Sequence, residues 1–361
     1  MADRLTKMRC RFGMPAQTTE IFCGSGILRD CLADGLVKKC SSLRVVVDKQ
    51  VWKLHEMLLR TVLPQQSQVL QIPGGERAKG ERQLRQLWKW LHQTETDRRS
   101  LLIAIGGGAT TDLVGLAAST YMRGVDLVLV PTTLLAQVDA AIGGKTAINL
   151  EDTKNIIGTF HPARRVICDS AYLDTLRPKQ LREGMIEALK AFAALDAVAY
   201  RRYRDRLVAC KPGDLPAGLI AGAVKLKCKV VERDPTESGW RKVLNLGHTT
   251  GHAYELLTGA SHGEGVAFGM LVAAELSKAL LNLAPRTAEE LIESVRHIYP
   301  RFRNPGVGAS DLWSKIAHDK KRSGKDFNFV LLRALGRHKV LPVTRAQFGI
   351  ALIATKERLK Q

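Results

Sequence analysis

Short apolar runs rich in β-branched residues alternate with amphipathic stretches through the first half of the chain. This pattern predicts four strands, at 43–48, 68–72, 101–105 and 126–131. Helical periodicity over 51–63 and 82–92 separates the first three of them. Because strand, crossover helix and strand follow one another, we expect a mostly parallel sheet covered by helices.

The pattern changes in the second half, where longer helical periods replace the strand signals. Helices are predicted at 184–195, 219–231, 248–257, 266–281 and 288–298. With 361 residues the chain is long enough for about two domains. We therefore expect an α/β domain over residues 1–178 and an all-α domain over residues 179–361.

Composition narrows the class of protein. Hydrophobic residues make up 45% of the chain and charged residues 25%, which is typical of globular proteins and excludes a largely disordered or fibrous chain. Nowhere do about 18 apolar residues run on without a charge, and the first residues lack an apolar segment, so neither a membrane span nor a secretory peptide is predicted.

Charge and cysteine content leave several partners open. The 55 Lys and Arg against 35 Asp and Glu give a net charge of +20, which suits nucleic acid, an anionic membrane surface or phosphorylated substrates, and equally a solvated basic surface. No basic helix carries interleaved aromatic residues, so we expect no nucleic-acid partner, and the lack of an apolar span predicts no membrane partner. The seven cysteines include no Cys-x-x-Cys pair and indicate reduced thiols in the cytoplasm.

A glycine-rich turn at 106–112 lies between an apolar strand and a helix. Glycine lets backbone N–H groups approach a pyrophosphate there, and the helix dipole favours its charge. The segment is not Gly-x-Gly-x-x-Gly, so alone it is a weak signal that a purely structural turn also explains. Asp48, Glu76 and Lys79 follow neighbouring strands, where a carboxylate can bind ribose hydroxyls or simply face solvent.

Three of the nine histidines fall within 15 residues. His248 and His252 are four residues apart, so on a helix both imidazoles face one side, and His262 follows shortly after. This spacing predicts His248 and His252 as two metal ligands, with Glu187 as a carboxylate ligand. The alternative for Glu187 is a simple i,i+3 ion pair with Lys190.

Charged and amide residues also stand among glycines and small residues between positions 120 and 155. They are Arg123, Asp139, Lys145, Lys154 and Asn155. Charges in such an apolar setting differ from a solvated run, so we interpret them as groups that bind anions and hydroxyls.

Taken together, the motifs resemble those of the 3-dehydroquinate synthases. The stretches PGGERAK, AIGGGATTDLVGLAASTYMRG, VPTTLLAQVDAAIGGKTAIN, TKNIIGTFHP, GMIEALK, LNLGHTTGHAYE, SHGEG and DKKRSGK occur in that family's order, over about residues 40–336. The resemblance implies an NAD-dependent lyase of the shikimate pathway that also needs zinc or another divalent cation such as cobalt. It would convert 3-deoxy-arabino-heptulosonate 7-phosphate to 3-dehydroquinate and phosphate, usually as a homodimer.

The resemblance also assigns roles to residues. Glu187, His248 and His262 would be the metal ligands, and His252 would move to the substrate phosphate. NAD would be bound by Asp48, Glu76, Lys79, Gly106, Gly107, Gly108, Asp112, Thr132, Thr133, Lys145, Lys154 and Thr175. The substrate would be contacted by Asp139, Lys145, Asn155, Lys190, Lys227, Arg241, Asn245, His252 and either Lys320 or Lys321. In related enzymes the arginine corresponding to Arg123 reaches the phosphate from the partner subunit.

Other members of this broad group remain as alternatives. Sister cyclases, among them aminodehydroquinate synthase, share the fold and both cofactors, although Lys227, Arg241 and Asn245 favour a substrate with a carboxylate. A metal- and NAD-dependent polyol dehydrogenase would release NADH, and its chemistry would leave the phosphate-binding residues without a use. Thr111 departs from the family, which usually has glycine there.

Overall fold

The computed structural model describes residues 6–11, 18–33, 35–151, 153–209, 215, 217–319 and 327–360. The chain forms two compact units. Unit 1 comprises residues 1–181 and 211–236, and unit 2 comprises residues 182–210 and 237–361. The segment 211–236, which the sequence pattern assigned to the helical part, belongs to unit 1 because its helix packs against strands of that unit.

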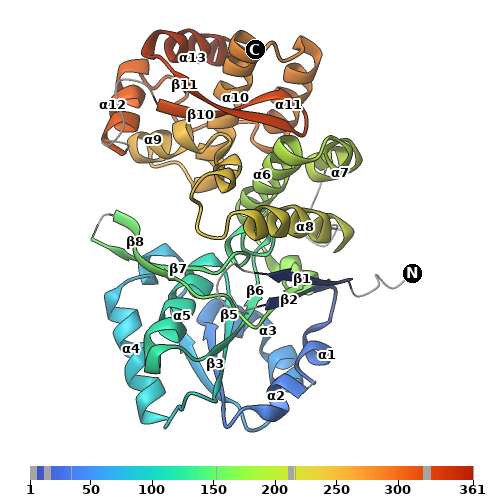
Figure 1. Cartoon of the computed structure of the whole chain (residues 1–361), viewed down its shortest axis with the longest axis vertical. Coiled ribbons are helices and arrows are strands. Elements are labelled where there is room, and N and C mark those ends of the chain that lie inside the picture. The colour runs from blue at the N-terminus through green and yellow to red at the C-terminus, as the bar shows by residue number, and fades with distance from the viewer. Residues whose placement is uncertain are drawn as a thin grey trace. The chain divides into compact units, whose positions relative to one another are not determined.

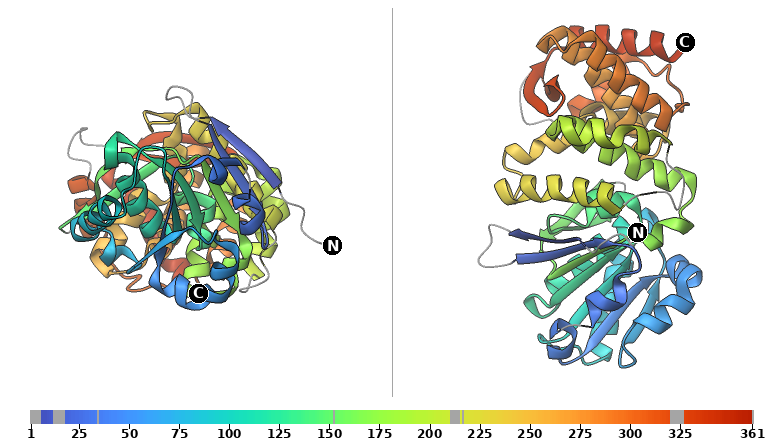
Figure 2. Two further views of the ribbon diagram at one scale, coloured as in Figure 1. Left: turned by 90° about the horizontal axis from the view of Figure 1, so that it is seen from below. Right: turned by 90° about the vertical axis from the view of Figure 1, so that its right-hand side faces the viewer.

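Unit 1 is built on a seven-stranded sheet (Figure 1). Its strands, in spatial order, are β1 (Thr6–Arg11), β2 (Thr18–Gly24), β9 (Arg165–Asp169), β6 (Asp126–Pro131), β5 (Leu101–Gly106), β3 (Leu43–Asp48) and β4 (Gln68–Ile72). All neighbouring pairs are parallel except β1 with β2, the dark-blue pair at one edge (Figure 2). The four predicted strands are confirmed, and the mostly parallel sheet with them.

Helices flank this sheet. They are α1 (Leu28–Leu32), α2 (Gly35–Lys39), α3 (Lys49–Val62), α4 (Glu81–Gln93), α5 (Gly108–Thr120) and α8 (Ala217–Arg233). Every residue of β5 is buried, as is nearly every residue of β3, which is the expected state of central parallel strands covered on both faces. One core cluster joins alternate residues of these strands, such as Val45 and Ile103, to Leu59 of α3 and Leu28 of α1.

The strand order of unit 1 reverses beside β3. The chain passes from β3 to β4 on one side of it and then returns to β5 on the other side. In open α/β sheets, ligands bind at the carboxyl ends of the strands where this reversal occurs. The two ends that meet there are Asp48, which closes β3, and Gly106, which closes β5.

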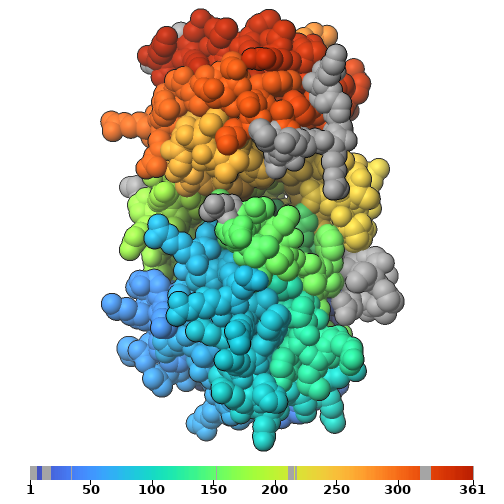
Figure 3. Space-filling view, turned by 90° about the vertical axis from the view of Figure 1, so that its left-hand side faces the viewer, coloured from blue at the N-terminus to red at the C-terminus, as the bar shows by residue number. Residues whose placement is uncertain are grey.

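Strands β1, β2 and β9 of the sheet were not predicted, nor were two antiparallel pairs outside it. β7 (Lys145–Leu150) pairs with β8 (Thr153–Phe160) in unit 1, and β10 (Phe327–Ala334) pairs with β11 (Arg337–Val343) in unit 2. β8 is exposed along almost its whole length, so its residues carry no alternation of buried and exposed positions for the sequence to display. Together with α4, this hairpin lines a groove of about 830 Å³; α4 is cyan and β8 green in Figure 3.

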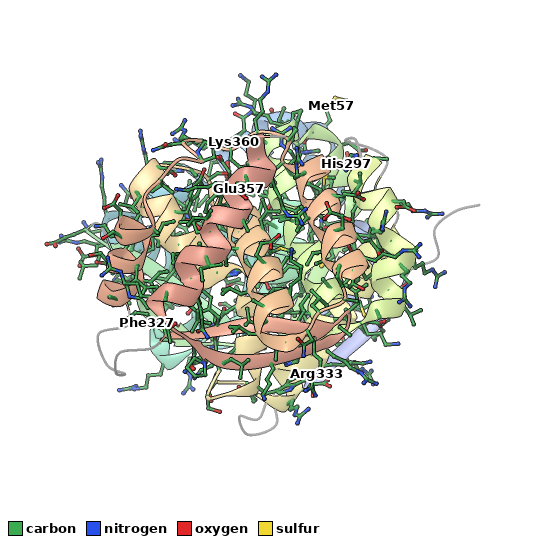
Figure 4. The ribbon with its side chains drawn as sticks, turned by 90° about the horizontal axis from the view of Figure 1, so that it is seen from above. Met57, His297, Phe327, Arg333, Glu357 and Lys360 are labelled. Atoms are coloured by element: carbon green, nitrogen blue, oxygen red, sulfur yellow. The ribbon has the colours of Figure 1, made fainter. Side chains whose placement is uncertain are left out.

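Unit 2 is mainly helical, as predicted. Its helices are α6 (Pro178–Leu195, which starts in unit 1), α7 (Ala197–Ala209), α9 (His248–Thr258), α10 (His262–Leu281), α11 (Pro285–Ile298), α12 (Ala309–Asp319) and α13 (Arg345–Lys360). α10 is buried on nearly all sides because α9, α11, α13 and β10 pack around it (Figure 4). No helix within the described ranges is long and apolar enough to cross a membrane.

Helices α9 and α10 approach each other through glycines. A β-carbon added at Gly269 would lie 1.8 Å from the carbonyl oxygen of Gly247, and one added at Gly251 would lie 2.7 Å from the carbonyl oxygen of Gly265. Gly247 and Gly251 are four residues apart along the chain, as are Gly265 and Gly269, so each segment presents its glycines on one face to the other. This contact leaves no room for a larger side chain at Gly269, and it holds α9 directly against α10.

Candidate active site

Three possible metal ligands meet in unit 2, each from a different helix. Glu187 lies in α6, while His248 and His262 are the first residues of α9 and α10. The Nε2 atoms of His248 and His262 lie 3.8 and 3.4 Å from Oε1 of Glu187, and one ligand atom from each residue lies within 4.8 Å of the others. Oε1 is buried and has no hydrogen-bond partner among the described residues. A bound cation would supply this oxygen with the partner that it lacks.

The second nitrogen of each imidazole is already engaged. Nδ1 of His248 lies 3.3 Å from the carbonyl oxygen of Leu246, and Nδ1 of His262 lies 3.0 Å from Oε1 of Glu255. With Nδ1–H donating to these acceptors, Nε2 of both rings carries the lone pair toward Glu187. Residues and orientation therefore fit a three-ligand zinc-type site with an open position.

Lys190 contributes a buried positive charge next to Glu187. Its ammonium donates to Oε2 of Glu187, and both side chains are almost fully buried. Burial opposes ionisation of Glu187, but Lys190 and the two imidazoles hold its pKa well below the ordinary value. Burial and the Lys190 charge lower the pKa of His248, so Glu187 is a carboxylate and His248 a neutral imidazole, the forms that bind metal.

Two carboxylates flank the imidazole of His262 and favour its protonated form when no cation is bound. Burial alone would lower the pKa of His262, but the carboxylates of Glu187 and Glu255 raise it to about 10. Nε2 of His262 faces Glu187, and Nδ1 of the same ring faces Glu255. A cation bound between Glu187 and His262 would take the place of the proton on Nε2.

His252 stands at the edge of the cluster. Its ring is exposed and lies 5.3 Å from that of His248 and 6.1 Å from that of His262. It belongs to a second possible set of ligands with Glu255 and His262, whereas Glu187 belongs only to the set with His248 and His262. The more buried set is the one that the family resemblance implies. Neither set contains both His248 and His252, the ligand pair that their spacing alone predicted.

The remaining residues expected in unit 2 lie just before α9. A 3-10 helix, Trp240–Asn245, carries Arg241, which is 2% exposed, and Asn245, whose Nδ2 donates to Oε1 of Glu237 at 3.3 Å. Lys320 and Lys321 lie outside the described residues.

In unit 1 the triple glycine joins β5 to α5. Gly107 is the N-cap of α5 and no side chain caps the helix, so the N–H groups of its first turn remain directed at the end of β5. A β-carbon at Gly107 would lie 3.1 Å from Cγ2 of Thr133, and Thr132 donates its N–H to the carbonyl of Gly106 at 2.9 Å. Gly108 packs similarly against Ala140. These are the features of a helix N-terminus that binds phosphate.

Thr111 does not obstruct this turn. The residue is 2% exposed, and its Oγ1 donates back to the carbonyl of Gly108 at 3.0 Å. The hydroxyl that threonine has and glycine lacks therefore forms its hydrogen bond within the helix.

Asp48 ends β3 and is the N-cap of α3, with Oδ1 accepting from the N–H of Gln50 at 2.7 Å. Gly74, in the loop after β4, packs on its carboxylate so closely that an added β-carbon would lie 1.7 Å from Oδ2. The carboxylate is thus fixed at the strand-order reversal, where a ribose would be bound in a dinucleotide site.

A polar network links several of the expected cofactor residues. Lys79 is 3% exposed and its ammonium lies 2.5 Å from Oδ2 of Asp112, while it also donates to Oδ1 of Asn155. Burial raises the pKa of Asp112 to about 6 although Lys79 opposes this. Asn149 joins the network to Glu76: its Nδ2 donates to Oε2 of Glu76 at 3.0 Å and its Oδ1 accepts from the N–H of Asn155 at 2.9 Å.

Asp139 and Lys227 form a second polar pair in unit 1. Asp139 lies in a one-turn π-helix, Ala136–Ala140, and Lys227 of α8 donates to its Oδ1. Gln137 fixes this turn, because its Nε2 donates to the carbonyls of Pro131 and Asp169 at 3.0 and 2.9 Å. A π-turn pinned between two strand ends sets the position of Asp139.

Four further residues complete the expected set. Lys145 and Lys154 are exposed on the β7–β8 hairpin. Arg123 is exposed in a turn where Met122, Arg123 and Gly124 all have positive φ. Thr175 contacts Nε2 of His55 through its Oγ1 at 3.0 Å.

Three residues that contribute to this geometry were not identified from the sequence. They are Glu255, Asn149 and Gln137. Glu255 follows His248 by seven residues, two helical turns along the same face, and this spacing was a signal that could have found it. Asn149 and Gln137 act through contacts between segments distant in sequence, which spacing does not reveal.

Fold and site define a class of proteins in which a dinucleotide-type parallel sheet precedes a helical part with a Glu–His–His cation site. Two family models match consecutive parts of this chain: 3-dehydroquinate synthase N-terminal at residues 69–183 and 3-dehydroquinate synthase C-terminal at residues 184–322. The chain belongs to the 3-dehydroquinate synthase family. It is 39% identical over 279 residues to a 3-dehydroquinate synthase of Geotalea uraniireducens, covering 76% of this chain and 78% of that one.

Solved structures share the fold. A 2-epi-5-epi-valiolone synthase from Streptomyces hygroscopicus, with NAD⁺ and Zn²⁺ bound, has a TM-score of 0.85 at 24% identity, covering 96% of this chain and 99% of that one. A 2-deoxy-scyllo-inosose synthase complexed with carbaglucose-6-phosphate, NAD⁺ and Co²⁺ has a TM-score of 0.83 at 23% identity, again covering 96% and 99%.

Proposed function

We propose that this chain converts 3-deoxy-arabino-heptulosonate 7-phosphate to 3-dehydroquinate and inorganic phosphate in the shikimate pathway. The observation that carries the proposal is the buried, orphaned oxygen of Glu187 facing two oriented imidazoles in a chain of this family. Relatives over most of the chain length bear the same enzyme name, and no comparison favours a sister cyclase or a polyol dehydrogenase.

Two bound groups supply chemistry that amino acids lack. NAD accepts a hydride and returns it, and a divalent cation, zinc or cobalt, acidifies a substrate hydroxyl. Glu187, His248 and His262 would hold the cation. The residues that would hold NAD are Asp48, Glu76, Lys79, Gly106, Gly107, Gly108, Asp112, Thr132, Thr133, Lys145, Lys154 and Thr175. Support comes from the uncapped N-terminus of α5 and from the carboxylate of Asp48, at the carboxyl ends of β5 and β3.

The chain's polar residues would then orient the substrate. Lys227 would bind the substrate carboxylate as a point charge. Arg241 would bind it through two N–H groups of its guanidinium, and the side chain is held in place because the residue is only 2% exposed. Lys145, Asn155 and His252 would position the phosphate for elimination. Asp139, Lys190 and Asn245 would bind hydroxyls; Lys227 and Lys190 already pair with Asp139 and Glu187 and are held in place by them.

We also propose a cytoplasmic homodimer. Ile156, Ile157 and Phe160 of β8 are 59, 40 and 38% exposed on a hairpin beside a groove, a surface that a second copy would cover. Arg123 would then serve the partner's site. Among the described cysteines, Cys23, Cys40 and Cys168 are free thiols, which supports a reducing compartment.

The function is tested by following inorganic phosphate and absorbance of reduced cofactor together, with protein, NAD, zinc and the heptulosonate phosphate. We expect phosphate to be released over many turnovers per NAD, without accumulation of NADH. Formation of one NADH per substrate molecule, with no phosphate released, would instead indicate a dehydrogenase. A control without NAD should release no phosphate, because elimination requires the prior oxidation.

A further inference from the structure

Glu255 is not one of the ligands in the Glu187, His248 and His262 set, yet it makes the contact that orients one of them. Its Oε1 lies 3.0 Å from Nδ1 of His262, and its side chain is 10% exposed. It comes from α9, and His262 is the first residue of α10. The contact therefore spans the two helices that pack through Gly251 and Gly265, and the same glycine contact brings the Glu255 side chain alongside α10.

We propose that Glu255 is a positioning residue for the cation site: it fixes the tautomer and the ring orientation of His262 and strengthens Nε2 as a ligand. A carboxylate that accepts Nδ1–H leaves the lone pair on Nε2, which faces Glu187, and increases the basicity of the ring. His248 has the weaker form of this arrangement, because its acceptor is the uncharged carbonyl of Leu246 at 3.3 Å. The proposal rests on the proposed cation site.

The second possible set of ligands, His252, Glu255 and His262, gives Glu255 a competing role as a direct ligand. Geometry favours the positioning role. Nδ1 of His262 is within hydrogen-bond distance of Glu255, and Nε2 of the same ring points to Glu187. An ion in the second set would have to displace the Nδ1 hydrogen bond and would lose the buried carboxylate of Glu187.

The test measures zinc affinity directly, by competition between metal-free protein and a chromophoric chelator, together with the visible spectrum of the Co²⁺-loaded protein. We expect Glu255→Gln to weaken zinc binding by about tenfold, because an amide still accepts the hydrogen bond without the charge, and Glu255→Ala by about a hundredfold. The Co²⁺ spectrum should keep the band pattern of the unsubstituted protein in Glu255→Gln, since the ligand set is unchanged.

Two control variants make the result specific. Glu264→Gln removes a carboxylate two residues after His262 that accepts from the N–H of Arg303 at 2.5 Å, and it should bind zinc like the unsubstituted protein. His252→Ala should also keep zinc. An equal loss of zinc affinity in His252→Ala and Glu255→Ala would place the ion in the second set of ligands and overturn the proposal. Unchanged zinc affinity in both Glu255 variants would overturn it as well. Unchanged affinity in His248→Ala would instead reject the cation site itself.

Discussion

Replacement of His248 by alanine is expected to abolish cation binding and turnover together. The ring supplies one of three ligands, and its Nε2 lies 3.8 Å from the buried oxygen of Glu187. Loss of an outer hydrogen-bond partner costs about 10 to 100-fold in metal affinity, so loss of a ligand should exceed the upper end of that range. Zinc content after dialysis, measured by atomic absorption beside the rate of phosphate release, provides the test.

The matched variant is His252→Ala, one turn further along α9. It should retain zinc and lose turnover, because we place His252 at the substrate phosphate. Equal zinc loss in the two variants would contradict the assignment of the ligands. Circular dichroism of both proteins would show that neither has lost its helices.

Gly269→Ala should strongly destabilise unit 2 and disturb its cation site. The added β-carbon would lie 1.8 Å from the carbonyl oxygen of Gly247, and backbone atoms cannot move aside as a flexible side chain can. Overpacking of a core usually costs about 1 to 3 kcal/mol, and this collision should reach or exceed the upper figure. We expect Tm to fall by about 5 °C or more, and zinc affinity to fall with it because α9 and α10 must separate.

A second helical glycine of unit 2 offers the control. Gly349, in α13, has no atom within 4 Å of an added β-carbon. Gly349→Ala should leave zinc affinity unchanged and stabilise the protein by up to about 1 kcal/mol, because alanine favours the helix. If Gly269→Ala and Gly349→Ala had the same Tm, the glycine contact would not be what holds α9 against α10.

The sequence predicted those parts of the fold whose residues carry a strong period. β3, β4 and β6 begin and end at the predicted residues, because apolar runs bounded by polar residues or proline mark both ends. β8 was missed because it is exposed along its length. The β10–β11 hairpin follows the last predicted helix and was missed, although Gly336 and the apolar runs on either side of it are a hairpin signal.

The candidate site was predictable only in part from chemistry and spacing. Two histidines four residues apart predicted a ligand pair, and the resemblance to the family was needed to select His262 over His252. Neither source revealed that Glu255 reaches His262 or that Asn149 links Glu76 to Asn155, since both contacts depend on how elements pack. Tertiary contacts of this kind have no period in the sequence.

In the proposed reaction, a hydride is removed from the substrate and returned to the same molecule. The most direct test uses heptulosonate phosphate with deuterium at the carbon whose hydroxyl is oxidised, together with unlabelled NAD, and analyses the dehydroquinate by mass spectrometry. We predict full retention of deuterium in the product and none in the NAD pool. Deuterium in the NAD pool, or a product that has exchanged it for hydrogen, would contradict the account.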